Sequence, residues 1–173
     1  MEKTLTTDAG LACVNRDAPW DYLDKHHLVI TGGPGTGKTS AINDLLDQLE
    51  TLPGDRRFIL CDGKFNAKFK EVAGLSLASN LIEVEDYIGG VADTLTNRLL
   101  LSESELMGKD PVFLIVDEFS FLKDEINENT LQALTQIVIN GGPLNIHVIL
   151  ATQKVNFNEN EINTFAKIDL NNY

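Results

Sequence analysis

The sequence is poor in cysteine and has no long apolar run, and each shortage excludes a class of protein. Two cysteines in 173 residues, Cys13 and Cys61, are too few and too far apart for a disulfide framework, so reduced thiols are expected. The apolar runs have the length of strands and are too short to span a bilayer. Residues 1–18 also lack the basic-then-apolar order of a signal peptide. The chain is therefore expected to be cytoplasmic.

Basic residues are also few. Fourteen lysines and arginines stand against 26 acidic residues, which gives a formal net charge of −12 at pH 7. Such a surface resists non-specific binding to DNA or anionic lipid. It does not exclude nucleic acid, because a ring of subunits can line a pore with a few basic side chains. The length and the 43% hydrophobic content predict one domain, residues 1–173, with one core.

One stretch, Leu28–Leu46, organises the rest of the chain. Its β-branched apolar run ends at a glycine-rich turn, and Lys38 then opens a segment with apolar residues at helical spacing. This order predicts a strand, a loop and an amphipathic helix. From Gly32 to Thr39 the spacing fits G-x-x-x-x-G-K-[ST], the phosphate-binding loop. The alternative, a glycine-rich turn with an accidental Lys-Thr pair, requires a rare chance match.

The loop residues have predicted roles in binding ATP and Mg²⁺. Backbone N–H groups of the loop would turn inward around the triphosphate, at a helix N-terminus that favours anions. Lys38 would bridge the β- and γ-phosphates, Thr39 would place its hydroxyl on Mg²⁺, and Ser40 could reach the inner phosphates. The residues expected to bind the nucleotide are Gly33, Pro34, Gly35, Thr36, Gly37, Lys38, Thr39 and Ser40.

Apolar patterns predict strands that alternate with helices. Strands are expected over Leu28–Thr31, Arg57–Cys61, Leu81–Val84, Val112–Val116 and His147–Ala151, with a short edge strand over Leu11–Val14 and a turn at Pro19-Trp20. Helices are expected from Lys38, over Tyr87–Met107 with Asp86 as its cap, and over Asn127–Asn140. Residues 1–24 would form an N-terminal extension, and residues 154–173 a short helix and a final strand. The alternation predicts an α/β three-layer sandwich with a mainly parallel sheet.

Polar residues follow several of these strands where they end, at the edge at which ligands bind in open α/β sheets. Asp117 would hold the water shell of the metal, and Glu118 would polarise the attacking water. Gln153 could sense the γ-phosphate or place that water. Alternatively, the acidic pair only ends a strand and Gln153 is a solvated loop residue. For Asp62 and Lys64, a functional role at this edge and a merely structural role at the end of a strand are evenly balanced.

Aromatic residues and histidines lie before the first predicted strand. Trp20 and Tyr22 are expected to pack beneath that strand, with an adenine-stacking platform as the alternative. His26 and His27 have no cysteine or carboxylate at metal-ligand spacing, so we expect them at the surface or at the strand edge.

Together these residues resemble a known family. The runs G-G-P-G-T-G-K-T, D-G-K, V-F-L-I-V-D-E-F and H-V-I-L-A-T-Q-K are similar to the motor domain of FtsK/SpoIIIE-type ATPases, over about Pro19–Gln153. The resemblance implies a RecA-like core in which the strand ending at Gln153 lies between the phosphate-loop strand and the Asp117 strand. The family's usual T-T-G-S-G-K-S loop is replaced, the chain is short after Gln153, and no basic DNA-reading module is present.

The resemblance implies an ATP-driven motor that moves a polymer, with neighbouring ATPase subunits or tandem domains as partners. The departures from the family pattern slightly favour protein secretion of the type VII (EccC or EssC) kind, within a membrane-anchored parent complex. The alternatives are translocation of double-stranded DNA, conjugation or packaging, and an ATP-binding regulatory or docking domain with little turnover. Such motors take an arginine finger from a neighbour, and none of the four arginines in the chain could be assigned that role. They are Arg16, Arg56, Arg57 and Arg98.

Overall fold

The computed structural model describes residues 11–13, 19–154 and 165–172, in which a parallel six-stranded sheet is the central layer. The strands run in the order β5-β4-β6-β7-β3-β8, and each neighbouring pair is parallel. Their bounds are β3 His27–Thr31, β4 Arg57–Asp62, β5 Leu75–Ala78, β6 Val112–Asp117, β7 Ile146–Thr152 and β8 Phe165–Asp169. The predicted insertion of β7 between the phosphate-loop strand β3 and the Asp117 strand β6 is confirmed.

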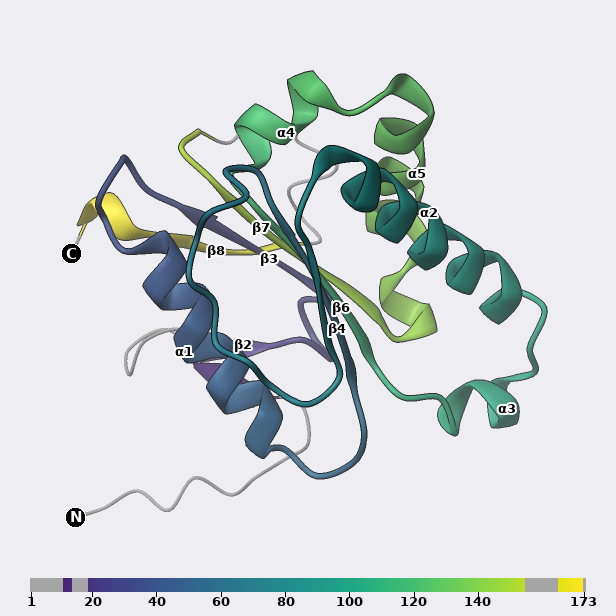
Figure 1. Ribbon diagram of the computed structural model, residues 1–173. Coiled ribbons are helices and arrows are strands. Elements are labelled where there is room, and N and C mark those ends of the chain that lie inside the picture. Colours follow the sequence, from purple (N-terminus) through teal and green to yellow (C-terminus); the bar gives the residue numbers. More distant parts are fainter. Residues whose placement is uncertain (1–10, 14–18, 155–164, 173) are drawn as a thin grey trace, which may run out of the picture.

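Helices cover both faces of the sheet (Figure 1). Helix α1, Lys38–Thr51, packs on one face with the strand residues Phe113 and Ile115. The opposite face carries Leu114 and Val116, which pack against three other helices. Those helices are α2 Leu81–Arg98, α4 Phe119–Glu125 and α5 Glu128–Asn140. Because consecutive strand residues point to opposite faces, the continuous apolar run of β6 supplies both cores. The α/β three-layer sandwich is thereby confirmed.

Residues 75–107 differ from the expected order. The predicted strand Leu81–Val84 is wrong, because these residues form the first turn of α2 and the strand lies upstream as β5. Asn80 begins the helix, since its side chain accepts the Glu83 N–H at 3.0 Å, so Asp86 lies inside α2 and is not its cap. The helix predicted to reach Met107 ends at Arg98, and α3, Glu103–Met107, begins at a capping box of Ser102 and Glu105.

The N-terminal and C-terminal segments also differ in part from the expectation. Strand β1, Leu11–Cys13, pairs with β2, Pro19–Asp21, in a separate antiparallel sheet, so Pro19-Trp20 is not a turn. Trp20 is 1% exposed in the core beneath β3, as expected. Two 3-10 turns follow helix α5 and strand β8, namely η1 Gly142–Leu144 and η2 Leu170–Asn172. The helix expected before the final strand falls partly outside the described residues.

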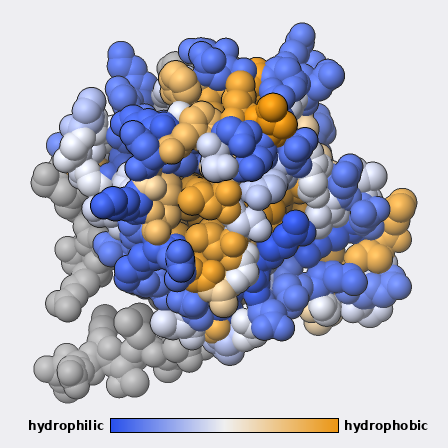
Figure 2. Space-filling view, viewed as in Figure 1, coloured by the Kyte–Doolittle hydropathy of each residue, from blue (hydrophilic) through white to orange (hydrophobic). Residues whose placement is uncertain are grey.

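The surface is mostly polar, with apolar side chains exposed in several places. Figure 2 shows apolar side chains reaching the surface between α1 and α2. Exposed apolar residues of this region of the chain include Leu77 on the edge strand β5 and Ile82 at the start of α2. None of the helices in the part of the chain that the structure describes combines the length and the apolar character that a bilayer crossing requires.

Buried histidines tie the amino ends of the central strands together. His27 is the first residue of β3, at the strand edge as one of the two expectations had it, but it is buried and not at the surface. The Val138 carbonyl lies 2.9 Å from His27 Nε2, and the Val148 N–H donates to His27 Nδ1 at 2.9 Å. Since a carbonyl only accepts and an amide only donates, His27 is the neutral Nε2–H tautomer and links β3 to α5 and β7. Burial lowers the pKa of His27 to about 3 and that of His147 to about 4.

These depressed pKa values predict acid lability. Below pH 6.5 the unfolded chain takes up protons at both histidines, whereas the folded chain does not until about pH 4 or 3. The free energy of unfolding should therefore fall by up to roughly 1.4 kcal/mol per pH unit for each histidine in that window. Thermal unfolding between pH 4 and 6 should show a shallower pH slope for His27→Gln than for the parent. A His26→Gln variant, which keeps both buried rings, controls for the loss of an imidazole, and equal slopes for parent and His27→Gln would contradict the assignment.

Candidate nucleotide-binding site

The predicted phosphate loop connects β3 to α1, and its glycines are needed for two reasons. Gly35 and Gly37 have φ values of 77° and 97°, in the left-handed region that favours glycine. At Gly32 the reason is steric, because a Cβ atom would lie 2.2 Å from Thr36 Oγ1. That hydroxyl donates to the Gly33 carbonyl at 2.8 Å and closes the turn. Gly32, Gly35 and Gly37 therefore have no direct substitute in this turn.

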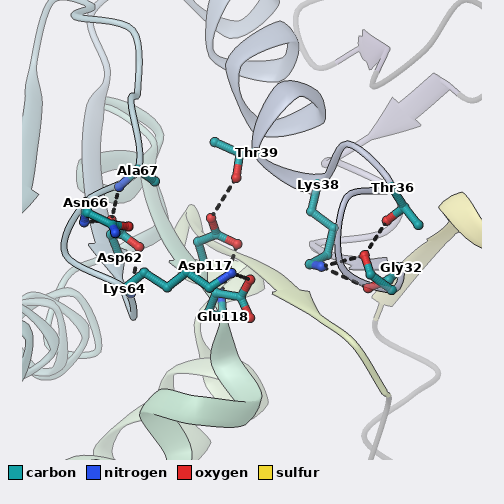
Figure 3. Close-up of polar contacts among 11 residues, drawn as sticks. Gly32, Thr36, Lys38, Thr39, Asp62, Lys64, Asn66, Ala67, Asp117 and Glu118 are labelled. Carbon is teal, nitrogen blue, oxygen red and sulfur yellow. Dashed lines mark hydrogen bonds and ion pairs between the residues drawn. The ribbon is translucent and has the colours of Figure 1, made fainter.

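Lys38 lies folded against this loop (Figure 3). Its side chain is 6% exposed, and Nζ donates to the Gly32 carbonyl at 2.8 Å and to the Gly33 carbonyl at 3.2 Å. The ammonium group is thus held at the concave turn where a helix N-terminus already favours an anion. Ser40, on the first turn of α1, and Pro34, at the tip of the loop, are exposed.

The end of β6 reaches the start of α1 at this same edge. Thr39 Oγ1 donates to Asp117 Oδ2 at 3.3 Å, and the Glu118 N–H donates to Asp117 Oδ1 at 2.9 Å. Burial raises the pKa of the Asp117 carboxyl group. Thr39 and Asp117 are 78 residues apart in the sequence, yet the fold places the hydroxyl of one beside the carboxylate of the other.

This pair of oxygen donors fits a magnesium ion that arrives with a nucleotide. Magnesium sites of that kind use one or two protein ligands, with phosphate oxygens and water completing the octahedron. Within the residues that the structure describes, no group of three histidine, cysteine, aspartate or glutamate side chains could hold a metal ion by itself. The donor set of Thr39 and Asp117 therefore suits a metal–nucleotide complex better than a resident metal.

Glu118 follows in an unusual backbone conformation. Its φ of 54° is left-handed, and it stands immediately before α4, a helix that the sequence pattern did not predict. Lys64 Nζ lies 2.9 Å from Glu118 Oε1, and this contact raises the pKa of the lysine. The Lys64 side chain is 58% exposed, so the pair stands at the rim of the site.

Asp62 and Lys64, which the sequence left evenly balanced, have different surroundings. Asp62 is 2% exposed, and its carboxylate accepts the backbone N–H groups of Lys64, Asn66 and Ala67 at 2.8 to 3.0 Å (Figure 3). It therefore shapes the turn after β4 that brings Lys64 to Glu118. The sequence contained the D-G-K run but no signal for the partner of its lysine.

Gln153 is exposed just beyond β7. It lines a cavity of about 270 Å³ beside α4, together with Ser120, Lys123 and Lys154 among others. The Ser120 hydroxyl is hydrogen-bonded to that of Thr152 at the end of β7, which fixes α4 against this strand. The structure thus places Gln153 at the same edge of the sheet as the phosphate loop, on the α4 side.

Comparisons with known proteins agree with this fold. The sequence matches the family model described as an AAA domain over residues 23–159. No protein of the curated set matches it. EccC ATPases 2 and 3 from Thermomonospora curvata have a TM-score of 0.65 at 15% identity, and EssC ATPases 2 and 3 from Geobacillus thermodenitrificans have 0.66 at 17%. The conjugation coupling protein TcpA of pCW3 has a TM-score of 0.62 at 17% identity.

These matches cover 83%, 92% and 79% of this chain but only 28%, 36% and 45% of the solved chains, in that order. The chain therefore spans less than half the length of these three structures. At such identities the likeness establishes a shared fold, which accords with the FtsK/SpoIIIE-type and EccC/EssC resemblance of the motifs. The family match extends over most of the residues, and the chain belongs to the AAA domain family of P-loop ATPases.

Proposed function

We propose that this chain binds ATP with Mg²⁺ and hydrolyses it. The observation that carries the proposal is the contact of Thr39 Oγ1 with Asp117 Oδ2 at 3.3 Å, because it joins the phosphate loop to the acidic pair. A nucleotide in the loop would then have its terminal phosphate beside the buried ammonium of Lys38 and the carboxylate of Glu118. Positioning and electrostatic stabilisation are the main requirements of phosphoryl transfer.

Each group has a proposed role. Backbone N–H groups from Gly35 to Ser40 would hold the phosphates, with Gly33 and Pro34 completing the turn of the loop, and Lys38 would exchange a carbonyl partner for the β- and γ-phosphates. Thr39 and Asp117 would hold the metal, which supplies positive charge against the developing negative charge of the phosphates. Glu118 would polarise the attacking water, and Gln153 would sense the γ-phosphate.

Basal turnover should be slow, for two reasons that the described residues supply. Lys64 holds the Glu118 carboxylate at 2.9 Å, so the carboxylate must share its charge between the lysine and a water. The guanidinium group of Arg56 donates to backbone carbonyls just after α1, and that of Arg98 to carbonyls just before β6 and β7. Arg57 begins β4 at the opposite edge of the sheet. We therefore place the arginine finger on a neighbouring subunit or tandem domain.

We further propose that the chain, as a single ATPase domain, moves a polymer, with protein as the preferred cargo. The fold is shared with structures named as type VII secretion ATPases and with a conjugation coupling protein. One such EccC structure holds a signal sequence peptide. The net charge of −12 favours a protein over DNA, whose phosphates require cationic contacts. Transport of double-stranded DNA is the second candidate, supported by the likeness to TcpA.

Lys38→Ala tests nucleotide binding. Removal of the ammonium group takes away charge-assisted bonds to the phosphates, so the dissociation constant for ATP should rise by roughly 100-fold or more. Titration calorimetry with MgATP measures the change. Lys109→Ala, at an exposed lysine before the start of β6 and so at the opposite edge of the sheet, should bind like the parent. Undiminished ATP binding by Lys38→Ala would exclude the phosphate-loop assignment.

Glu118→Gln separates binding from turnover. The amide cannot polarise water as the carboxylate does, so turnover should fall by roughly 10²- to 10⁴-fold while affinity for MgATP is retained. Steady-state phosphate release and calorimetry give the two values. Glu125→Gln, at an exposed position of α4, is the matched control. Normal turnover in Glu118→Gln would show that Glu118 does not polarise the attacking water.

The dependence of turnover on protein concentration tests the state of assembly, and the effect of added double-stranded DNA on turnover tests the cargo. Turnover per chain should rise steeply with concentration if neighbours supply the arginine, and double-stranded DNA should have no effect if the cargo is protein. Stimulation by DNA would favour the DNA motor instead. Tight ATP binding with flat turnover at every concentration would support a docking domain.

A further inference from the structure

The turn that follows the last strand lies against the phosphate loop. Strand β8 pairs with β3 in a register that sets Asp169 beside Thr31, the residue before the loop. The next residues, in η2, therefore meet the loop from the side opposite to Asp117, which contacts Thr39. At Gly32, a Cβ atom would lie only 3.2 Å from Leu170 Cβ, so the two segments are in close contact.

One side chain of this turn is oriented toward the loop by defined hydrogen bonds. Asn171 Oδ1 accepts the Gly33 N–H at 3.0 Å, and Asn171 Nδ2 donates to Asp169 Oδ1 at 2.9 Å. Asp169 Oδ1 also accepts the Asn171 backbone N–H at 3.0 Å. The carboxylate requires a donor and the backbone amide requires an acceptor, so only this orientation of the Asn171 amide satisfies both.

The bond made by Asn171 restrains the same peptide unit that holds Lys38. The peptide between Gly32 and Gly33 offers its carbonyl to the Lys38 ammonium at 2.8 Å and its N–H to Asn171. Because glycine flanks this peptide on both sides, its rotation meets little steric resistance. The Asn171 bond therefore adds a restraint from outside the loop on the position of the carbonyl and, with it, of the ammonium.

We propose that Asn171 is a positioning residue for nucleotide binding, a role that rests on the proposed ATP-binding function. Through the Gly32–Gly33 peptide it holds the loop and Lys38 in one arrangement before ATP arrives. A loop that is already ordered loses less conformational freedom on binding, so its dissociation constant for ATP is lower. Asp169 supports the role by fixing the Asn171 amide.

The test compares Asn171→Ala with Asn140→Ala, a control whose amide donates only within α5, to Gln136. Asn171→Ala should raise the dissociation constant and the KM for ATP by roughly three- to tenfold, the range expected for one hydrogen bond. The kcat should change by less than about twofold, since the restraint acts before the chemical step. The thermal midpoint without nucleotide should equal that of the parent, because the side chain is exposed.

A measurement without nucleotide distinguishes failure of this inference from failure of the proposed function. Amide hydrogen exchange at Gly33, followed by NMR, should be faster in Asn171→Ala and unchanged in Asn140→Ala. Asp169→Ala should speed the same exchange but add little to Asn171→Ala. Unchanged exchange at Gly33, or faster exchange with unchanged ATP affinity, would overturn the proposal. If the parent itself fails to bind ATP, the proposed function fails, while the exchange data still test the contact.

Discussion

The parallel pairing of β7 with both β3 and β6 is the constraint on which the site depends. All seven residues of β7 are buried, and its apolar side chains contribute to both cores, so this strand fits only in the middle of the sheet. Its register places Thr152 beside Thr31, and Leu150 beside Val116. The carboxyl ends of three strands thereby meet at one edge, and Thr39 reaches Asp117 across the end of β7.

The opposite edge of the sheet is fixed by polar groups that have no proposed role in catalysis. Arg98 is 8% exposed, and it donates to the carbonyls of Asp110, Leu144 and Asn145 at 2.7 to 3.0 Å. His27 closes β3 against β7 and the end of α5. A buried donor or acceptor without a partner costs about 1 to 3 kcal/mol, so these contacts secure the strand order. The chemistry at one edge therefore relies on satisfied backbone groups at the other.

The sequence predicted those parts of the site that are contiguous in the chain. The phosphate loop and the Asp117-Glu118 pair follow from local spacing and from a buried strand that precedes each of them. The place of β7 between β3 and β6 came from the family resemblance, because periodicity alone does not pair strands. The partner of Lys64 and the contact of Asn171 with Gly33 depend on which strands are neighbours and in what register, so no local pattern reveals them. The strand predicted over Leu81–Val84 was wrong for another reason, since a short, mostly apolar run fits a strand and a capped helix turn equally well.

The charges of the site already have partners before any nucleotide is present. Lys38 is held by two loop carbonyls, and Lys64 by the carboxylate of Glu118. On the proposed function, a triphosphate would exchange the partners of Lys38 rather than fill an unpaired charge, and its affinity would be the difference between the two sets of bonds. Lys38 would exchange neutral carbonyl acceptors for charged phosphate oxygens, and this exchange would strengthen its hydrogen bonds. A water polarised by Glu118 would compete with the full ion pair to Lys64, so we propose that a neighbour assists the release of this carboxylate.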